Sequence, residues 1–399
     1  MIDIDFPIVF ILLFIINNMM LNRLSKKYSF FDKKLMNYLY WYHLLFFAIY
    51  FMYSIYNNSD SLLYYLTVGN KGDQWPELFY TGTRFISFFA VPFVYLGLSY
   101  SSVMLVASWF GYVGFVYAYL YFRESIPINV TVFGRFDLLT LLLFLPNMHF
   151  WTASLGKGAL IFMGLMVFTQ AVKFPQKRIV ALLIGGFFIY MVRPHVMLFV
   201  LVGVMIGILT GKGKISIGIK LLVLVASIVF LAAASSSILA VAKLENSENV
   251  VDDFEQFSDT NSAKLESSAK SGVSMASYPL PLKLFTFWFR PLFVDSPGAI
   301  GMFSSVENLI YLLLFAKICN RRFLRFILKA PYMVKMSIIV FLLSSFALTF
   351  VMSNLGIIMR QKSMVMYFGF FVIYYFLAQE KWEQMQRLKE RNNAVALNA

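Results

Sequence analysis

Polar residues that could do chemistry interrupt the long apolar runs of this chain at four places. The stretch Pro146–Gly158 carries His149, Trp151 and Lys157 between two apolar runs. Three shorter clusters have the same character: Asp60, Arg193-Pro194-His195 and Arg360-Gln361-Lys362. An ionisable side chain at membrane depth costs free energy unless it is paired or faces water, so these positions are candidate functional sites.

The chemistry these residue types favour is the binding of a phosphate or pyrophosphate group near lipid headgroups. An Arg can hold phosphate oxygens through two parallel hydrogen bonds, and Lys and protonated His add point charges. For each residue taken singly, the alternative is a long side chain that reaches the membrane interface without a ligand. Asp60, which precedes the aromatic pair Tyr64 and Tyr65, could act as a general base towards a sugar hydroxyl, or could simply cap a helix.

Composition predicts an all-α, polytopic integral membrane protein. Of 399 residues, 60% are hydrophobic and 18% aromatic, which leaves too few polar residues to cover a soluble globule. The net charge of +14 comes from Lys and Arg in short loops between apolar runs, which is typical of cytoplasmic loops. We therefore expect the lipid bilayer, and no nucleic acid, as a partner.

Several classes of site are absent from the sequence. Cys319 is the single cysteine, which excludes an intramolecular disulfide and any cysteine-based metal site. There is no nucleotide-binding glycine loop and no His-Glu-x-x-His zinc motif, and the three histidines form no cluster in sequence. We expect no cofactor, and a divalent metal stays open only as an alternative without a visible ligand set.

Loop charge predicts the topology. Basic residues in 23–34, 173–178, 212–214 and 321–335 indicate cytoplasmic loops, and acidic or polar residues in 57–83 and 243–283 indicate outer ones. The first apolar run, Phe6–Met20, is expected to be retained as a helix rather than cleaved as a signal peptide. The pattern predicts about 11 crossings (10 to 13), with the N-terminus outside and the C-terminus in the cytoplasm.

Two segments are expected not to cross. The number of crossings between the first outer loop and residues 173–178 must be odd, whereas four apolar segments lie between them, and we assign 78–98, with Pro92 inside it, as re-entrant or surface-lying. Leu284–Val294 is too short to span and is expected to be re-entrant or interfacial. The chain is thus read as one transmembrane domain, 1–378, with a large extracytoplasmic loop and short interfacial helix at 243–300, followed by a charged cytoplasmic tail, 379–399.

With this topology the four clusters and Arg290 all lie at the outer face. Basic residues are disfavoured in outer loops, so their presence on that side favours a cation-lined cavity. Glu307, inside the apolar run 301–317, is expected to pair with a nearby Arg, and Arg290 is the candidate. The Ser-rich, acidic part of the 243–283 loop, Glu245–Ser271, is expected to be mobile because it has few apolar anchors.

The layout resembles the GT-C superfamily of polytopic glycosyltransferases that use lipid-phosphate-linked sugars. The acid in the first large outer loop, the Pro-containing turn before a long helix and the outer Arg carry this likeness. Within the superfamily, three tracts are most similar to bacterial O-antigen and exopolysaccharide polymerase-like proteins: Pro146-x-x-His149-Phe-Trp151-x-x-x-Leu-Gly156-Lys157, Arg193-Pro-His195 and Asn354-x-Gly356-x-x-x-Arg360-Gln-Lys362. The chain departs from the usual pattern in lacking an acidic pair after the first crossing.

The resemblance implies glycan transfer from an undecaprenyl-diphosphate carrier at the outer face of the bacterial inner membrane, without a metal, in surface polysaccharide biosynthesis. Asp60 or His149 would take the proton of the acceptor hydroxyl, while Trp75 and Trp151 would stack on sugars. The diphosphate would lie against the cationic residues Lys157, Arg193, His195, Arg290, Arg360 and Lys362. The expected partners are the polyprenyl-diphosphate-linked glycan and other polysaccharide-assembly proteins. Two alternatives stay open: a lipid-linked oligosaccharide flippase or other transporter, and a non-catalytic membrane subunit of an export or assembly complex.

Overall fold

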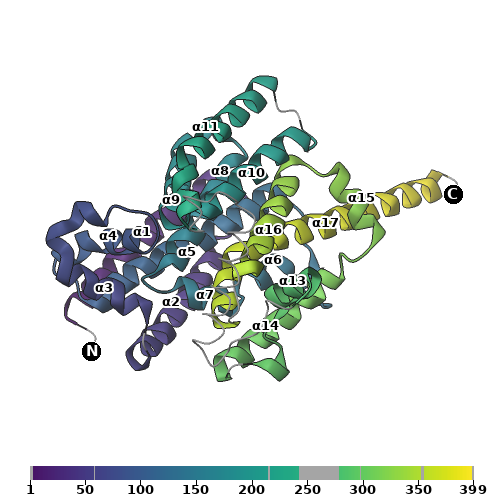
Figure 1. Cartoon of the computed structure of the whole chain (residues 1–399). Coiled ribbons are helices and arrows are strands. Elements are labelled where there is room, and N and C mark those ends of the chain that lie inside the picture. Colours follow the sequence, from purple (N-terminus) through teal and green to yellow (C-terminus); the bar gives the residue numbers. More distant parts are fainter. Residues whose placement is uncertain are drawn as a thin grey trace.

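A computed structural model describes residues 3–57, 59–213, 216–241, 278–296, 298–351 and 355–397. The described chain is mostly helical, which confirms the all-α expectation, and its only strands form a two-stranded antiparallel hairpin. Figure 1 shows the helices gathered into one bundle, from which the C-terminal end of the last helix protrudes. Most of the predicted outer loop at 243–283, including its expected mobile part Glu245–Ser271, lies outside the described residues.

The helices of the N-terminal half are α1 (Asp5–Lys27), α2 (Lys33–Tyr56), α3 (Asp60–Lys71), α4 (Thr83–Tyr95), α5 (Tyr100–Ser125), α6 (Leu138–Leu143), α7 (Pro146–Thr152), α8 (Lys157–Val172) and α9 (Ile179–Val192). Those of the C-terminal half are α10 (Pro194–Thr210), α11 (Ile217–Val241), α13 (Leu280–Phe289), α14 (Gly298–Ala316), α15 (Arg321–Lys329), α16 (Tyr332–Val351) and α17 (Leu355–Leu397). Strands β1 (Thr131–Val132) and β2 (Phe136–Asp137) pair directly before α6. Three short 3-10 turns occupy Gly72–Leu78, Pro175–Lys177 and Phe293–Asp295.

Three helices of the described chain are long and apolar enough to cross a membrane. They are α1, α5 and most of α16. The pair α14 and α15, bent by 80° at their junction, would make a fourth if it is one broken span. The other helices of the described chain do not meet the length and apolarity expected of a span, so the expected count of about 11 crossings is not confirmed.

The core is built around three helices that are buried on nearly every side. α5 packs against α1, α2 and α8, and α8 packs in turn against α9. The first half of α17 is enclosed by α16, α14, α13, α7 and α8. Since nearly all side chains of these three segments are buried, they are the inner helices of the bundle.

The predicted cytoplasmic loops meet at one end of this bundle. Arg178 donates hydrogen bonds of 2.6 and 2.8 Å to the Glu124 carboxylate, and the Tyr332 hydroxyl donates to the Lys173 carbonyl at 3.1 Å. These contacts join the loops after α5 and α8 to the start of α16. The 26 residues of α5 extend about 39 Å from this end at 1.5 Å per residue.

The other end of α5 meets the predicted outer segments. Its cap, Ser99, donates from backbone and side chain to Asp5 (2.9 and 3.0 Å). α4 begins beside Met191, whose carbonyl accepts from Gly82 at 2.7 Å, and is followed by Leu98, which accepts from Tyr65 in α3. Both ends of α4 are therefore tied to this one end of the bundle.

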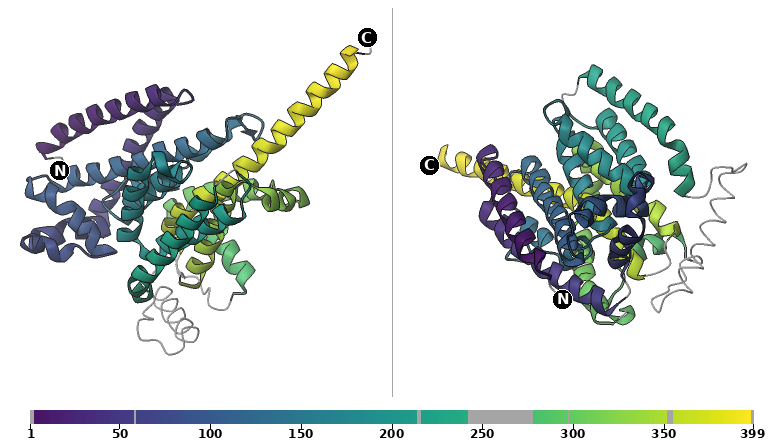
Figure 2. Two further views of the ribbon diagram at one scale, coloured as in Figure 1. Left: turned by 90° about the horizontal axis from the view of Figure 1, so that it is seen from above. Right: turned by 90° about the vertical axis from the view of Figure 1, so that its left-hand side faces the viewer.

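Two helices bear on the expected domain boundaries: α13 before residue 300 and α17 at the C-terminal end. The short helix expected before residue 300 is α13, ten residues long, which packs against α14, α16 and α17, and its Trp288 donates to the Ser345 hydroxyl at 2.9 Å. The expected boundary at 378/379 is not a break in the structure. α17 continues as one helix of 43 residues, so the charged tail is an extension of a core helix, as Figure 2 shows.

Three glycines at four-residue spacing let α10 lie directly against α16. A Cβ on Gly207 would stand 2.8 Å from the Met336 nitrogen and 2.8 Å from the Tyr332 oxygen, both backbone atoms. Gly203 and Gly211, one turn to either side, are equally confined. Small residues at this spacing allow two helix backbones to approach closely, which is a common way to associate helices in a membrane.

We therefore predict that Gly207→Ala destabilises the bundle. The added methyl must push two backbones apart, at a cost of about 1–3 kcal/mol. Gly218→Ala is the matched control, because a Cβ there meets nothing within 4 Å. Thermal unfolding of the two purified variants in detergent checks this, and equal midpoints would contradict the close packing of α10 on α16.

Candidate functional site

Five of the predicted site residues line one small cavity at the end of the bundle that carries the predicted outer segments. They are Asp60, Trp151, Lys157, Arg193 and Arg360. They come from α3, α7, the start of α8, the break between α9 and α10, and α17. The chain thus brings together residues as far apart as 60 and 360, and we call this space the outer cavity after the side on which the topology prediction places it.

An ion pair closes one side of the outer cavity. The Arg360 guanidinium donates to the Asp60 carboxylate at 2.8 Å, and the two side chains are 38% and 55% exposed. Asp60 is the first residue of α3, where a negative charge is favoured by the helix dipole. Tyr64, four residues later on the same face, also lines the cavity.

Arg193 lies in the break between α9 and α10. Pro194 begins α10 and cannot continue the hydrogen bonding of α9, so the helix breaks there and Arg193 has an extended backbone. The Arg193 Nε is buried without a hydrogen-bond partner among the described residues. Burial, and to a smaller extent the Arg360 guanidinium, lowers the pKa of Arg193 to about 10, which leaves it charged at neutral pH.

Lys157 is held next to Trp151 by a tight turn. Gly158 permits the approach, because a Cβ there would stand 2.2 Å from the Trp151 carbonyl oxygen. Lys157, Arg193 and Arg360 against Asp60 give three cations and one carboxylate, a formal net charge of +2. Buried positive charge with an unpartnered N–H is costly unless an anion compensates it. The outer cavity is therefore suited to an anion.

The cavity is small in this conformation. Its volume is about 30 Å³, which is room for about two water molecules at 10–15 Å³ each. A phosphate group could enter only if the surrounding elements moved apart. The Asp60–Arg360 pair is the most exposed part of the wall and is the natural place for such an opening.

A buried polar network stands directly behind Trp151. The Trp151 Nε1 donates to the Asn147 side chain at 3.0 Å, and the Asn147 side chain donates to the Met359 carbonyl at 3.1 Å. The Asn147 backbone N–H donates to the Glu307 carboxylate at 2.7 Å, and the Tyr311 hydroxyl donates to the same carboxylate. This network joins α7, α14 and α17 immediately beneath the cavity.

His149, a candidate base, does not line the outer cavity. It is fully buried, its Nε2 contacts the Leu143 carbonyl at 2.7 Å, and its Nδ1 contacts the Nδ1 of His43 at 2.8 Å. The ring also stacks on Phe115. Both nitrogens are occupied by protein groups, so a direct role of His149 towards a substrate stays a prediction without geometric support.

Arg290 and Lys362 lie together in a neighbouring polar region. Arg290 forms an ion pair with Asp295, so the expected pairing of Glu307 with Arg290 is wrong. Lys362 is 1% exposed and donates to the Arg290 carbonyl (2.9 Å) and to Asn308 Oδ1 (2.5 Å). The Lys362 ammonium group is thus hydrogen-bonded to protein groups in this conformation.

His195 and Trp75 are also outside the outer cavity lining. His195 is partly buried in the first turn of α10, and its Nδ1 has no hydrogen-bond partner among the described residues. Trp75 is 40% exposed, its ring lies tilted against Phe88, and its Nε1 donates to the Phe88 carbonyl at 3.2 Å. A sugar-stacking role for Trp75 would require a substrate that extends beyond the cavity.

Sequence reasoning missed three lining residues: Tyr50, Ser61 and Met364. Met364 lies four residues after Arg360 on the same helix face, so its spacing was a usable signal, whereas Ser61 is merely the residue next to Asp60. Tyr50 sits in an apolar aromatic run with no such signal. No group of three or more His, Cys, Asp or Glu side chains that could hold a metal ion occurs in the described part of the chain.

Comparison with known proteins gives no relative on which to test these assignments. No family model, no curated protein and no solved structure matches the chain. The site is therefore argued from its own geometry.

Proposed function

We propose that this chain is a membrane glycosyltransferase or polymerase that transfers glycan from an undecaprenyl-diphosphate-linked donor at the outer face of the bacterial inner membrane. The observation that carries the proposal is the convergence of Asp60, Lys157, Arg193 and Arg360 on one cavity from four distant segments. Cations that merely reach the membrane interface without a ligand would have no reason to gather around one cavity. Three of them around one carboxylate match a diphosphate beside a hydroxyl acceptor.

In this proposal the cations act on the leaving group. Negative charge grows on the diphosphate as the glycosidic bond to the lipid breaks, and preorganised cations stabilise that charge most strongly in the transition state. Arg193 and Arg360 supply planar donors, and Lys157 supplies a point charge. Trp151 would stack on the sugar next to the diphosphate.

Asp60 is the proposed general base. In the closed cavity its carboxylate is engaged by Arg360 at 2.8 Å. When a diphosphate enters, Arg360 turns to it and Asp60 is released to accept the proton of the acceptor hydroxyl. This exchange of partners would at once place Arg360 on the leaving diphosphate and free Asp60 as the base for the acceptor hydroxyl.

We further propose that the shorter apolar helices also cross the membrane, giving about 11 crossings with the N-terminus outside and the C-terminus in the cytoplasm. Arg360 and Glu380 lie 20 residues apart on α17. That is about 30 Å at 1.5 Å per residue, the thickness of a hydrocarbon core. The outer cavity and the charged end of α17 would then face opposite sides of the bilayer.

The first prediction concerns the two arginines. Arg193→Ala or Arg360→Ala is expected to abolish long-chain surface polysaccharide in the source organism, while protein level and membrane insertion stay near normal. Arg→Lys is expected to rescue only in part, because it keeps the charge but loses the planar donor pair. Polysaccharide length on gels checks both.

Arg84→Ala is the matched control for these variants. Arg84 lies on α4 at the same end of the bundle, contacts the Tyr80 ring and does not line the outer cavity. Polymer of normal length in both cavity Ala variants, at normal expression, would remove the substrate-binding role and favour a transporter or a non-catalytic subunit.

A second prediction separates binding from chemistry. Asp60→Asn removes the base but raises the formal charge around the cavity by one, so donor binding should be equal or tighter while transfer falls by at least about 100-fold. Binding of a polyprenyl diphosphate and transfer of labelled glycan, measured on the same purified variant, test this. Loss of binding together with transfer would make Asp60 a structural residue.

A third prediction concerns topology. A reporter that is active only outside the cytoplasm should work when inserted within 246–275 and fail within 320–330, because the second segment carries Arg321, Arg322 and Arg325. The reverse pattern would put the outer cavity on the cytoplasmic side and exclude the proposed reaction there.

A further inference from the structure

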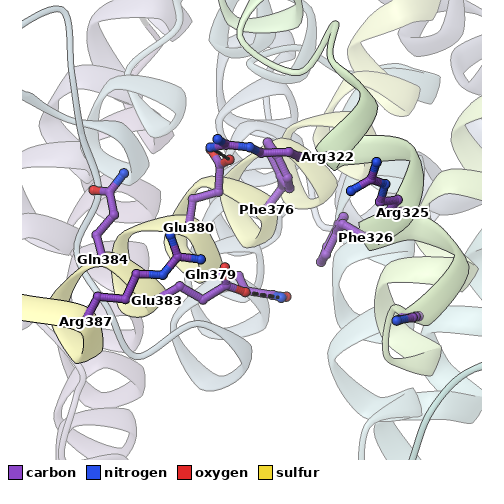
Figure 3. A pocket seen from close by; sticks show the side chains of 10 residues that line it. Arg322, Arg325, Phe326, Phe376, Gln379, Glu380, Glu383, Gln384 and Arg387 are labelled. Carbon is purple, nitrogen blue, oxygen red and sulfur yellow. Dashed lines mark hydrogen bonds and ion pairs between the residues drawn. The ribbon is translucent and has the colours of Figure 1, made fainter. Parts of the chain in front are cut away.

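A second, larger cavity lies farther along α17, beside residues 376–387. It is a groove of about 390 Å³ between α15 and α17, within the range of about 300–1,000 Å³ typical of small-ligand sites. Figure 3 shows Arg322 and Arg325 on the α15 wall and Glu380, Glu383 and Arg387 on the α17 wall. We call it the inner groove.

The inner groove is positively charged. Its ionisable lining consists of Arg322, Arg325, Lys329 and Arg387 against Glu380 and Glu383, a formal net charge of +2. Arg322 is paired with Glu380 at 3.7 Å, but the Arg322 side chain is 80% exposed. Such an exposed ion pair contributes about 0–1 kcal/mol and can be exchanged for a better anion at little cost.

α15 has the form of a helix that lies in a membrane interface. Its cations occupy one face, and Phe323 and Phe326 on the next face pack against Phe376 with ring centroids 5.3 Å apart. Beyond them Leu324 and Leu328 are 65% and 75% exposed. A helix with cations on one side and exposed leucines on the other places its apolar face among acyl chains and its cations among headgroups.

The position of α15 is also that of a helix lying in a membrane interface. It is bent by 80° from α14, so it turns away from the direction of that apolar helix. The groove lies about 30 Å along α17 from the outer cavity, at 1.5 Å per residue. Trp382, half exposed on the adjoining turn of α17, is the kind of residue enriched at membrane–water interfaces.

We propose that the inner groove binds the phosphate headgroup of an anionic phospholipid from the cytoplasmic leaflet. Arg325 and Lys329 hold the phosphate and Arg322 exchanges Glu380 for it, while Leu324 and Leu328, outside the groove lining, keep α15 among the acyl chains of the leaflet. The inference rests on the proposed membrane orientation and not on the proposed reaction. Juxtamembrane cations recognise anionic headgroups in this way, and an α15 that lies in the membrane interface places lipid headgroups, rather than a soluble phosphate, beside the groove.

The test uses the full chain in detergent and native mass spectrometry with dioleoyl phosphatidylglycerol as the probe. The protein should retain one phosphatidylglycerol at least about tenfold more tightly than dioleoyl phosphatidylcholine. Each basic residue near an anionic headgroup contributes a favourable free energy of about the size that a tenfold preference requires. Arg325→Ala/Lys329→Ala should lose that preference. Arg321→Ala/Arg23→Ala, which removes the same charge from exposed residues outside the groove, should keep it.

A variant expected to bind phosphatidylglycerol more tightly shows that the loss in Arg325→Ala/Lys329→Ala is not caused by misfolding. Glu380→Gln removes the carboxylate that competes for Arg322, so it should bind phosphatidylglycerol more tightly than the unmodified chain. Unchanged phosphatidylglycerol binding in Arg325→Ala/Lys329→Ala, or weaker binding in Glu380→Gln, would overturn the proposal. Displacement of the lipid by millimolar glycerol 3-phosphate would also overturn it, because the groove would then be a site for a soluble phosphate. None of these outcomes bears on glycan transfer, which is measured separately.

Discussion

The buried Glu307 carboxylate is the contact on which the outer half of the bundle depends. It accepts from the Asn147 backbone and from Tyr311, so it fixes the start of α7 against α14. Asn147 then bonds to Met359, one residue before Arg360, and to Trp151. A carboxylate buried at this depth is tolerated only when its acceptor sites are filled. The same bonds that satisfy it therefore set where the cavity residues of α7 and α17 stand relative to each other.

α17 connects the two charged cavities of the molecule as one continuous helix. Its first half is enclosed by other helices, so it cannot move without repacking the core, whereas its C-terminal half leaves the bundle. Arg360 near one end lines the outer cavity, and Glu380 beyond the core lines the inner groove. A ligand at either place would act on the same rigid element. Communication between the two would still require a ligand to favour one position of α17 over another.

The sequence predicted the helical class, and five of the ten predicted site residues line the outer cavity, for physical reasons. Uncompensated cations between apolar runs are costly wherever they fall, so Lys157, Arg193 and Arg360 could be singled out before their contacts were known. Which acid an arginine pairs with depends on tertiary packing, and Arg290 forms its ion pair with Asp295 rather than with Glu307. The burial of His149 against His43 was equally unpredictable, because it depends on which face of α7 meets α2.

The two ends of the bundle hold ion pairs of different strength, and this difference favours opening at the outer end. Arg178 and Glu124 are 11% and 12% exposed, and Arg178 donates twice to the carboxylate, so separating them would leave two poorly solvated charges. Arg360 and Asp60 are 38% and 55% exposed, and water can solvate both once they part. Such an exposed pair contributes about 0–1 kcal/mol, which a diphosphate bound by charge-assisted hydrogen bonds can readily offset. The Arg178–Glu124 pair joins α5 to the residue before α9, so an anion that parts Arg360 from Asp60 would leave this contact at the other end of the bundle intact.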